Sequence, residues 1–315
     1  MSVAAPAYVA LLESGELARR AEEACRLMTA CVLCAWKCRV NRAAGKTGFC
    51  RTGTLPRVSS YFPHLGEEDC LRGWRGSGTI FFANCNMRCQ YCQNYEISAL
   101  GQGTEITPEA LAGMMLELQE AGCHNINFVS PSHVVAPILV AVLIAAQAGL
   151  RLPLVYNTGG YDSPEALALL DGVIDIYMPD MKYGDAAIAQ KYNKVPDYPR
   201  HNYRAVREMH RQVGDLVIDP ATGLAQRGLL VRHLILPGGL AGTKAVMRFL
   251  AKEISPDTYV NLMPQYRPAY RAATEDMGVL SRPVTAEEVD EAYTIARRAG
   301  LHRFDTRRPF AIWRA

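Results

Sequence analysis

Short runs of apolar residues recur through the middle of the chain at the length of a β-strand. Patterns typical of amphipathic helices separate most of them, and two of these helices are predicted to begin at Thr107 and Ser163, each followed by a proline. Ser and Thr cap helix N-termini, and proline suits the first helical turn. A further helix is predicted at 285–300, where Thr285 and Glu288 have the spacing of a capping box. The strand candidates are residues 78–83, 126–130, 152–157, 174–180, 229–236 and 258–264.

Six strands that alternate with helices predict an α/β fold, in which a parallel sheet carries helices on its outside and is open or partly closed like an incomplete barrel. In such folds the chemistry gathers at the carboxyl ends of the strands. Polar residues follow several predicted strands at that end, although any one of them can simply cap a helix or close a turn. They are Cys85 after the first strand, Ser130, Ser132 and His133 after the second, Asn157 and Thr158 after the third, and Asp180 and Lys182 after the fourth.

Composition places the chain among ordinary globular proteins. Its 315 residues, 49% of them hydrophobic and 21% charged, can bury a core large enough for one barrel-sized domain or two smaller ones. The longest apolar stretch, 134–150, contains Pro137 and Gln147, which favours a buried helix over a membrane span. The first residues lack the basic start and the unbroken apolar stretch of a signal peptide. We therefore expect a cytoplasmic protein that has no membrane partner.

The charge balance predicts no nucleic-acid partner. The formal net charge is only +3, and the basic residues are scattered along the chain except for a few near the C-terminus, such as Arg307 and Arg308. Nucleic-acid-binding proteins usually carry a concentrated basic patch or stripe.

Cysteine is the most informative residue type in the chain. Ten cysteines in a cytoplasmic protein are more typical of metal ligands or reactive thiols than of disulfides, because reducing compartments keep thiols free. Cys25 and Cys123 are expected to be packed thiols. Seven others fall into two groups, one formed by Cys31, Cys34, Cys38 and Cys50 and the other by Cys85, Cys89 and Cys92.

Cys85, Cys89 and Cys92 form a Cys-x3-Cys-x2-Cys motif directly behind the first predicted strand. A structural zinc site usually closes with four protein ligands, whereas a four-iron cluster held by three cysteines leaves one iron open to bind a further ligand. The spacing lets three thiolates converge on one such cluster, and Tyr91 can cover the cluster or its ligand. These three cysteines are the candidate catalytic metal ligands.

The stretch "CNMRCQYCQN" resembles the signature loop of radical S-adenosylmethionine (SAM) enzymes, and the resemblance covers about residues 60–270. It implies a partial (β/α)6 TIM-like barrel and a [4Fe-4S] cluster whose open iron binds SAM. It also implies reductive cleavage of SAM to a 5'-deoxyadenosyl radical that abstracts hydrogen, with an electron donor such as flavodoxin or ferredoxin. In such enzymes the cofactor carries the difficult chemistry, and the protein supplies position and shielding.

Within that superfamily the chain is most similar to the pyruvate formate-lyase activating enzymes, in particular to an uncharacterised branch of their homologues. The stretches that carry this likeness are "GSGTIFF", "YNTGGY", "YMPDMK", "VRHLILPGG" and "NLMPQYRP". The likeness implies that Asp180 accepts hydrogen bonds from the ribose of SAM and that Lys182 and Arg232 pair with its carboxylate. Asn157 stands where these enzymes usually have an aspartate. A glycyl radical enzyme would then be the substrate.

Two departures separate the chain from those activating enzymes. Their Gly-Gly-Glu, whose backbone receives the amino group of SAM, is replaced here by "SPSH". Ser130 and Ser132 are the candidates for that contact, with His133 beside them. The histidine on the last strand of the activases is replaced by Gln265 or Tyr266. SAM binding is still expected, and the substrate is left open between a glycyl radical enzyme, a peptide and a small molecule.

The N-terminal cysteines, separated by two, three and eleven residues, supply enough ligands to close a metal site completely. Gly45 and Gly48 would let their loop fold back on the metal. Zinc and a second iron-sulfur cluster that passes electrons inward are equally compatible with four thiolates. Cys70, just upstream of the barrel, is a candidate for a thiol involved in hydrogen transfer or for an extra ligand.

The chain is accordingly divided into an N-terminal helix with a cysteine-rich metal-binding extension at 1–60 and a radical SAM partial barrel with a C-terminal helix at 61–315. The competing interpretation is a non-catalytic iron-sulfur scaffold or electron carrier that has kept the fold. A plain carrier has no use for Asp180, Lys182 and Arg232 in a SAM pocket, which favours the enzyme.

Overall fold

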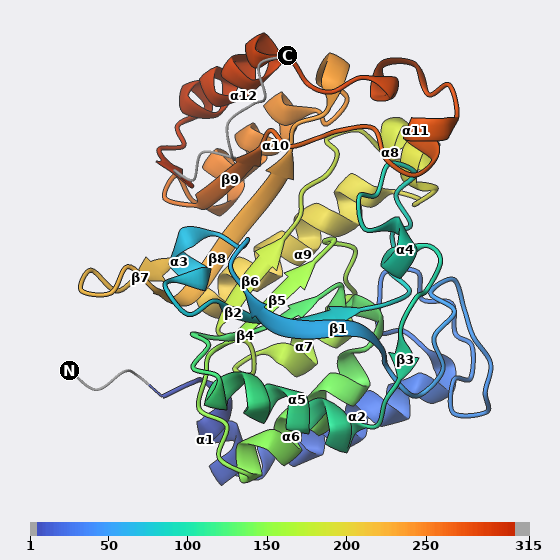
Figure 1. The fold of residues 1–315 in the computed structure, drawn as a ribbon, viewed down its shortest axis with the longest axis vertical. Helices are drawn as coiled ribbons and strands as arrows, with labels where there is room; N and C mark the ends of the chain where they lie inside the picture. Colours follow the sequence, from blue (N-terminus) through green and yellow to red (C-terminus); the bar gives the residue numbers. More distant parts are fainter. Residues whose placement is uncertain (1–4, 306–315) are drawn as a thin grey trace.

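A mostly parallel sheet forms the centre of the computed structural model, which describes residues 5–305 (Figure 1). Six neighbouring strands run parallel in the order β2-β4-β5-β6-β8-β9, and they coincide with the six apolar runs of the sequence. The α/β class and the parallel sheet are therefore confirmed. The bounds of these strands are β2 Ser77–Phe82, β4 Ile126–Val129, β5 Leu154–Thr158, β6 Ile176–Pro179, β8 Ala225–Leu234 and β9 Tyr259–Met263.

Four short or outlying strands extend the sheet and were not predicted. One of them, β1, pairs antiparallel with β2 and with β3, and β7 pairs antiparallel with β8, whereas β10 runs parallel to β9. The sequence of β1 mixes serines, aromatic residues and Pro63 without alternation, which is tolerated at the edge of a sheet but does not mark a strand. Their bounds are β1 Arg57–His64, β3 Thr104–Glu105, β7 Val217–Ile218 and β10 Arg303–Phe304.

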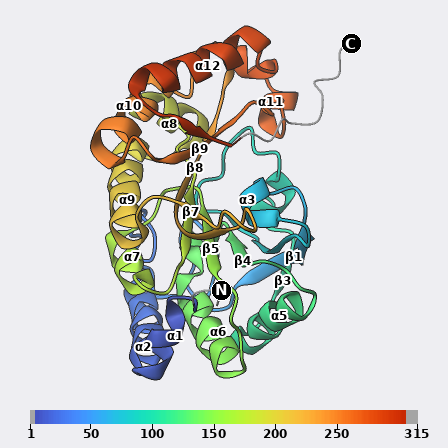
Figure 2. The same ribbon diagram turned by 90° about the vertical axis from the view of Figure 1, so that its left-hand side faces the viewer.

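The helices lie around this sheet, and Figure 2 shows α2, α7, α9 and α10 stacked along one side of the strands. The predicted caps are present: Thr107 and Ser163 each accept a hydrogen bond from the backbone N–H three residues on, and Thr285 and Glu288 form a capping box. The bounds are α1 Tyr8–Glu13, α2 Glu16–Leu27, α3 Asp69–Arg72, α4 Tyr95–Ser98, α5 Pro108–Glu120, α6 Val135–Gln147, α7 Pro164–Leu170, α8 Ala186–Asn193, α9 Tyr198–Val213, α10 Thr243–Phe249, α11 Arg271–Thr274 and α12 Ala286–Ala299.

The apolar stretch 134–150 forms α6, and most of its residues are buried, as predicted. It packs between α2 and α5 at the end of the molecule where α1 also lies (Figure 1). Across residues 5–305, no helix is both long enough and apolar enough to cross a bilayer.

The N-terminal segment joins this helix layer before it reaches the cysteines. The hydroxyl of Tyr8 in α1 donates to the carbonyl of Leu152 over 3.1 Å, and α2 packs on α6. A loop then runs from Cys31 to the start of β1 at Arg57. The predicted units 1–60 and 61–315 extend beyond the described residues at both ends, and Arg307 and Arg308 lie outside them.

Sheet register aligns the carboxyl ends of the central strands. Asn157 of β5 pairs with Val129 of β4 on one side and with Met178 of β6 on the other. The residues that follow these positions therefore leave the sheet along one edge, which brings Ser130 and Asp180 to the same end of the molecule.

Candidate active site

A cavity of about 390 Å³ lies at this edge of the sheet. Residues from the ends of all six parallel strands, or from the loops behind them, contribute to its wall. Those named in the sequence analysis are Cys85, Cys89, Cys92, Ser130, Asn157, Thr158, Asp180, Lys182, Arg232 and Gln265. The structure thus brings most of the predicted site residues together around one space.

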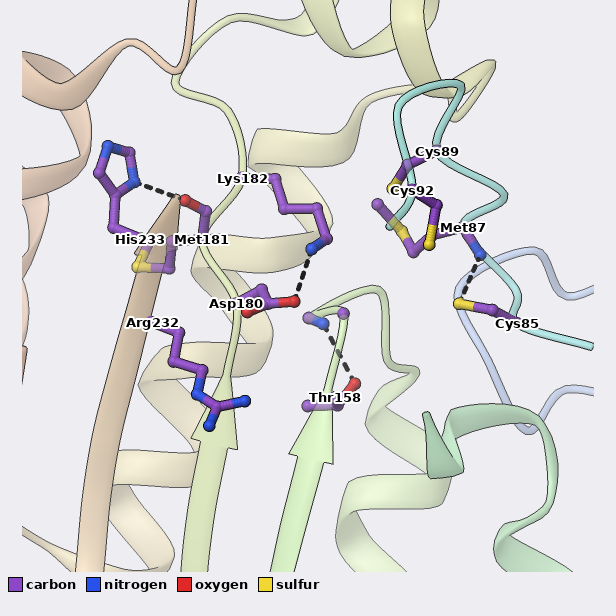
Figure 3. Close-up of polar contacts among 12 residues, drawn as sticks. Cys85, Met87, Cys89, Cys92, Thr158, Asp180, Met181, Lys182, Arg232 and His233 are labelled. Carbon is purple, nitrogen blue, oxygen red and sulfur yellow. Dashed lines mark hydrogen bonds and ion pairs between the residues drawn. The ribbon is translucent and has the colours of Figure 1, made fainter. Parts of the chain in front are cut away.

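The three cysteines of the signature motif lie in the loop between β2 and α4 (Figure 3). Each sulfur accepts a hydrogen bond: Cys85 from the backbone N–H of Met87 over 3.4 Å, Cys89 from Nδ2 of Asn193 over 3.1 Å, and Cys92 from the hydroxyl of Ser98 over 3.2 Å. Burial raises the pKa of the Cys85 and Cys89 thiols, and the ammonium of Lys182 opposes that rise at both. Hydrogen-bond donors and a nearby cation both favour the thiolate form.

Asp180 and Lys182 form an ion pair between the cysteine loop and β8 (Figure 3). The Nζ of Lys182 lies 2.5 Å from Oδ2 of Asp180, and both side chains are less than a fifth exposed. Burial disfavours the charged ammonium, but Asp180 and the nearby Cys89 outweigh it and raise the pKa of Lys182. The hydroxyl of Tyr198 fixes the backbone of this turn, because it accepts from the N–H of Lys182 and contacts the carbonyl of Asp180.

Arg232 borders the cavity, but its guanidinium already has carboxylate partners. Its Nε and Nη2 donate to the two oxygens of Glu68, each over 2.7 Å, and Nη2 also contacts Glu67. Asn261 donates to Glu68 over 2.7 Å as well. Burial opposes ionisation of Glu67, yet Arg232 and His64 keep the pKa of its carboxyl well below the usual range. The role in pairing with a ligand carboxylate that the resemblance implies for Arg232 does not fit this arrangement.

The "SPSH" turn after β4 places only its first serine at the cavity. Ser130 has a left-handed backbone, with φ of 60°. The hydroxyl of Ser132 lies 2.8 Å from that of Thr158, in a buried network that continues to Asp162. His133 is fully buried, and its Nε2 lies 2.9 Å from the carbonyl of Ala83. Ser132 and His133 do not border the cavity, and their direct contact with the cofactor stays an untested prediction.

Tyr91 does not border the cavity but packs in one apolar cluster with Cys89, so its role as a cover for the cluster or its ligand stays a prediction. It is buried, and its ring packs edge-on against Tyr183 and Tyr266, with ring centroids 6.4 and 5.7 Å apart. Gln265 does border the cavity, and its carbonyl accepts a hydrogen bond from Nε2 of Gln93 over 2.9 Å. Of the two residues proposed for the last strand, Gln265 is the one that borders the cavity.

The sequence analysis missed the acidic turn that precedes the barrel. Glu67 and His64 border the cavity, and the fully buried Glu68 stands behind them. The stretch "GEEDC" carries both glutamates directly before Cys70, and two adjacent acidic residues there are the signal for this turn. Cys70 packs in a separate apolar cluster with Leu71, away from the cavity wall, and burial raises its pKa to about 12.

The N-terminal cysteines lie close to one another. The thiols of Cys34 and Cys38 are each near enough to Cys31 and Cys50 for their charges to interact. A Cβ atom on Gly48 would lie 2.5 Å from Sγ of Cys38, so this glycine permits the close approach of the loop. Across residues 5–305, no three Cys, His, Asp or Glu side chains converge on a single metal-ion position.

A buried arginine stands beside these thiols. Arg42 is 1% exposed, and its Nη1 lies 3.7 Å from Sγ of Cys31 and 2.7 Å from the carbonyl of His133. Its Nε donates to the carbonyl of Gly53 over 2.8 Å. Within residues 5–305 no carboxylate forms an ion pair with it. A buried charge needs a counter-charge, and the cysteine sulfur is the group beside Arg42 that can become an anion.

The N-terminal loop touches the signature loop directly. Nε1 of Trp36 donates to the carbonyl of Asn86 over 2.8 Å, and the Trp36 ring stacks on Phe49 at 3.9 Å between centroids. The guanidinium of Arg88 also lies over the ring of Phe49, 4.4 Å from its centre. Residues from both cysteine groups are thus joined through one aromatic stack.

Comparison with known proteins identifies the superfamily. A family model described as the radical SAM superfamily matches residues 79–225. The uncharacterized protein MJ0674 of Methanocaldococcus jannaschii is 30% identical over 279 residues, which are 86% of this chain and 75% of that protein.

Among solved structures, a radical SAM methyltransferase from Sphaerobacter thermophilus is similar with a TM-score of 0.47 and 16% identity over 72% of this chain. The cobalamin-dependent SAM radical enzyme OxsB is similar with a TM-score of 0.40 and 14% identity over 71% of this chain. The chain spans 66% and 31% of these two proteins. The family model matches residues 79–225, and the relative from Methanocaldococcus jannaschii is 30% identical and is covered over 75% of its length. The chain therefore belongs to the radical SAM superfamily.

Proposed function

We propose that this radical SAM enzyme holds a [4Fe-4S] cluster on Cys85, Cys89 and Cys92 and cleaves SAM reductively to a 5'-deoxyadenosyl radical that abstracts hydrogen. The observation that carries the proposal is the single cavity bordered by all three thiols and by polar residues from the ends of neighbouring strands. When bound, the cluster supplies the electron that breaks the sulfonium bond of SAM. The chain supplies binding, orientation and exclusion of water.

The residues around the cavity fit this assignment. Each of the three sulfurs accepts a hydrogen bond, and as ligands of a four-iron cluster they would leave one iron without a protein ligand. The cavity of about 390 Å³ lies in the range of small-molecule sites, roughly 300–1000 Å³. Its polar groups stand opposite the cysteine loop, where they can orient a ligand held at the cluster.

Asp180 and Lys182 are proposed to orient SAM. Asp180 would accept hydrogen bonds from the ribose hydroxyls, and Lys182 would pair with the carboxylate, since its ammonium already lies between Asp180 and the cysteine loop (Figure 3). Asn157, Ser130 and Gln265 would supply further polar contacts from the wall. Arg232 is proposed as a positioning residue, because it holds Glu67 and Glu68 by ion pairs at the cavity.

The reaction after radical formation has two proposed forms. An activase would abstract hydrogen from a glycine of a partner protein, as the resemblance to pyruvate formate-lyase activating enzymes implies. Direct modification would act on a peptide or a small molecule. A non-catalytic electron carrier is disfavoured, because Asp180, Lys182, Glu67 and His64 give the cavity a charged, ligand-binding wall that electron transfer alone does not require.

The four N-terminal cysteines are proposed to hold a second metal centre, either zinc or an iron-sulfur cluster. The buried cation of Arg42 supports this, because thiolates of a metal centre at Cys31 would supply its counter-charge. The domain division at residue 60 follows the same proposal, with the extension as the part that carries this centre.

Reductive cleavage is tested by anaerobic reconstitution with iron and sulfide, reduction with dithionite, and chromatographic assay of 5'-deoxyadenosine formed from SAM. Wild type and Cys25→Ala, a thiol on α2 outside the cavity, are expected to form the product, and Cys89→Ala is not. Equal product from Cys89→Ala would contradict the proposal. So would a wild-type protein that holds a reducible cluster and binds SAM in a titration but forms no product with any substrate class tested.

A further inference from the structure

The loop around the N-terminal cysteines carries positive charges and no carboxylates. Residues 31–66 contain six cationic side chains and no Asp or Glu, although the formal net charge of the whole chain is only +3. The scattered appearance of basic residues along the sequence conceals this segment. Its cations are Lys37, Arg39, Arg42, Lys46, Arg51 and Arg57.

These cations differ in what they already contact. Arg42 is buried against Cys31, Lys37 pairs with Glu165 over 2.5 Å, and Arg57 lies 3.6 Å from Glu105. The other three, Arg39, Lys46 and Arg51, are exposed, and in the described part of the chain none has a carboxylate within ion-pair distance. They form a surface that is defined here as the basic face.

Two cations of the basic face, Arg39 and Arg51, lie near the exposed thiol of the cysteine group. Cys38 is the exposed thiol of the four, and it is followed directly by Arg39. Gly48 lies against the sulfur of Cys38, and the N–H of Arg51 donates to the carbonyl of Gly48 over 3.0 Å. Arg39 and Arg51 therefore lie close to the exposed thiol, and Figure 1 shows this loop beside β3 and below α4.

From this face the signature loop is close. Nη2 of Arg51 lies 3.3 Å from Oδ1 of Asn84, the residue before Cys85. Trp36, which bonds the backbone of Asn86, lies between the cysteines of the N-terminal loop in the sequence. A partner seated on the basic face would therefore sit next to the loop that the proposed function assigns to the cluster.

We propose that the basic face is the docking site for a small one-electron donor protein with an acidic surface. The proposal rests on the proposed function, which needs one electron for each SAM cleaved. In the docked complex, one electron leaves the reduced flavin or iron-sulfur group of the donor and reduces the cluster on Cys85, Cys89 and Cys92. The donor is oxidised by one electron, and no covalent bond forms or breaks at the face.

Two other uses of the cations are less consistent with their positions. The buried Arg42 is placed to compensate the charge of the thiolates. Arg39 and Lys46 are exposed to solvent, which screens their charges, so they stabilise thiolates at the N-terminal cysteines little. A nucleic acid would also be attracted by positive charge, but it gains nothing from an exposed thiol and from contact with the signature loop. An acidic redox partner uses all of these features.

The test compares a docked donor with a small reductant that needs no docking. Arg39→Glu with Lys46→Glu reverses two exposed charges, and Arg51 is kept because it contacts Asn84. The matched control, Lys252→Glu with Arg298→Glu, makes the same charge change on exposed positions of the last helical turns elsewhere. Oxidation of an acidic flavodoxin hydroquinone by the cluster-loaded proteins is followed by stopped flow at low and at high salt, and SAM cleavage with dithionite is measured alongside.

We expect Arg39→Glu with Lys46→Glu to lower the second-order rate of flavodoxin oxidation at low salt by about tenfold or more relative to the control, because electrostatic steering is lost. The difference should shrink at high salt. Dithionite-driven SAM cleavage should be the same in all three proteins.

Equal flavodoxin rates for variant and control would overturn the docking site while leaving the proposed function intact. Failure of dithionite to drive SAM cleavage in every protein would count against the proposed function instead. Binding of a mixed-sequence single-stranded RNA that the variant abolishes, with the flavodoxin rate unchanged, would replace the donor with a nucleic acid and overturn the proposal.

Discussion

Arg232 and Glu68 form a two-pronged ion pair, in which Nε and Nη2 of the arginine each lie 2.7 Å from one carboxylate oxygen of the glutamate. The pair joins β8 to the turn before α3, two segments 164 residues apart in the sequence. Neither glutamate of this turn is appreciably exposed, and Asn261 of β9 holds the same carboxylate. Arg232 and Glu67 border the cavity, and Glu68 holds the guanidinium from behind them.

Breaking this pair is expected to destabilise the fold strongly. Glu68→Gln removes one of the two carboxylates that pair with the buried guanidinium of Arg232, while Glu67 remains as its counter-charge. Loss of hydrogen bonds between charged groups costs about 1.5–3 kcal/mol in the free energy of unfolding. Denaturant unfolding of the variant against wild type measures the change. Glu23→Gln, which breaks the exposed pair with Arg26 on α2, is the control and should leave the unfolding midpoint unchanged. A Glu68→Gln midpoint equal to that of the control would show that the pair contributes little.

The buried ring of His133 predicts a specific pH dependence of stability. Burial, together with the nearby Arg42, lowers the pKa of His133 from 6.5 to about 3. Between those values the unfolded chain takes up a proton that the folded chain does not, so the free energy of unfolding falls as the pH falls. For one histidine the loss between pH 7 and pH 5 is about 2 kcal/mol.

Urea unfolding of wild type and His133→Gln at the two pH values isolates this contribution. Glutamine retains an N–H donor for the carbonyl of Ala83 but does not titrate. Asp175, whose pKa burial raises to about 6, acts with the opposite sign and cancels in the comparison. Wild type should lose about 2 kcal/mol more than the variant on going from pH 7 to pH 5. If the free energy of unfolding falls equally in both proteins, His133 takes up a proton in the folded chain as readily as in the unfolded chain.

The central strands and the starts of three helices were predictable from sequence. Each central strand is an apolar run of fitting length, and the starts at Thr107, Ser163 and Thr285 are fixed by local hydrogen bonds within one helical turn. Residues at strand ends were also predictable as a group, because parallel strands share one carboxyl edge. Asp180 and Lys182 reach the cavity for that reason.

Side-chain direction within the turns was not predictable. Ser130 turns into the cavity because its backbone is left-handed, which sends Ser132 toward Thr158 and His133 toward Ala83. The partner of Arg232 was not predictable for a different reason. Glu68 precedes Arg232 by 164 residues and lies in the turn between β1 and α3, so no local sequence pattern connects the two residues.

The carboxylate of Asp180 is expected to contribute to SAM affinity. Asp180→Asn keeps the size of the side chain and the backbone contacts of the turn, but it weakens hydrogen bonds to the ribose and leaves Lys182 without its partner. Hydrogen bonds to charged groups contribute about 1.5–3 kcal/mol, so the dissociation constant should rise about tenfold to a hundredfold. Calorimetric titration of the cluster-loaded protein with SAM measures this. Asp290→Asn, an exposed change on α12, is the control, and equal affinities for the two variants would remove Asp180 from the site.

The pairing of Arg42 with Cys31 predicts how firmly the N-terminal cysteines hold metal. In Arg42→Met the side chain keeps much of its apolar volume but loses the positive charge 3.7 Å from the sulfur. Partners of metal ligands typically change metal affinity by about 10- to 100-fold when they are replaced, and we expect metal release to a chelator to accelerate by about the same factor. The measurement is made in a chain whose Cys85, Cys89 and Cys92 are replaced by alanine, so that all bound metal belongs to the N-terminal group. Elemental analysis of that chain also distinguishes zinc from iron. Lys46→Met, which removes an exposed charge of the same loop, is the control and should release metal at the unaltered rate. If both variants release metal equally fast, or if the chain with the three alanines binds no metal, Arg42 has a structural role only and the N-terminal cysteines do not form the proposed centre.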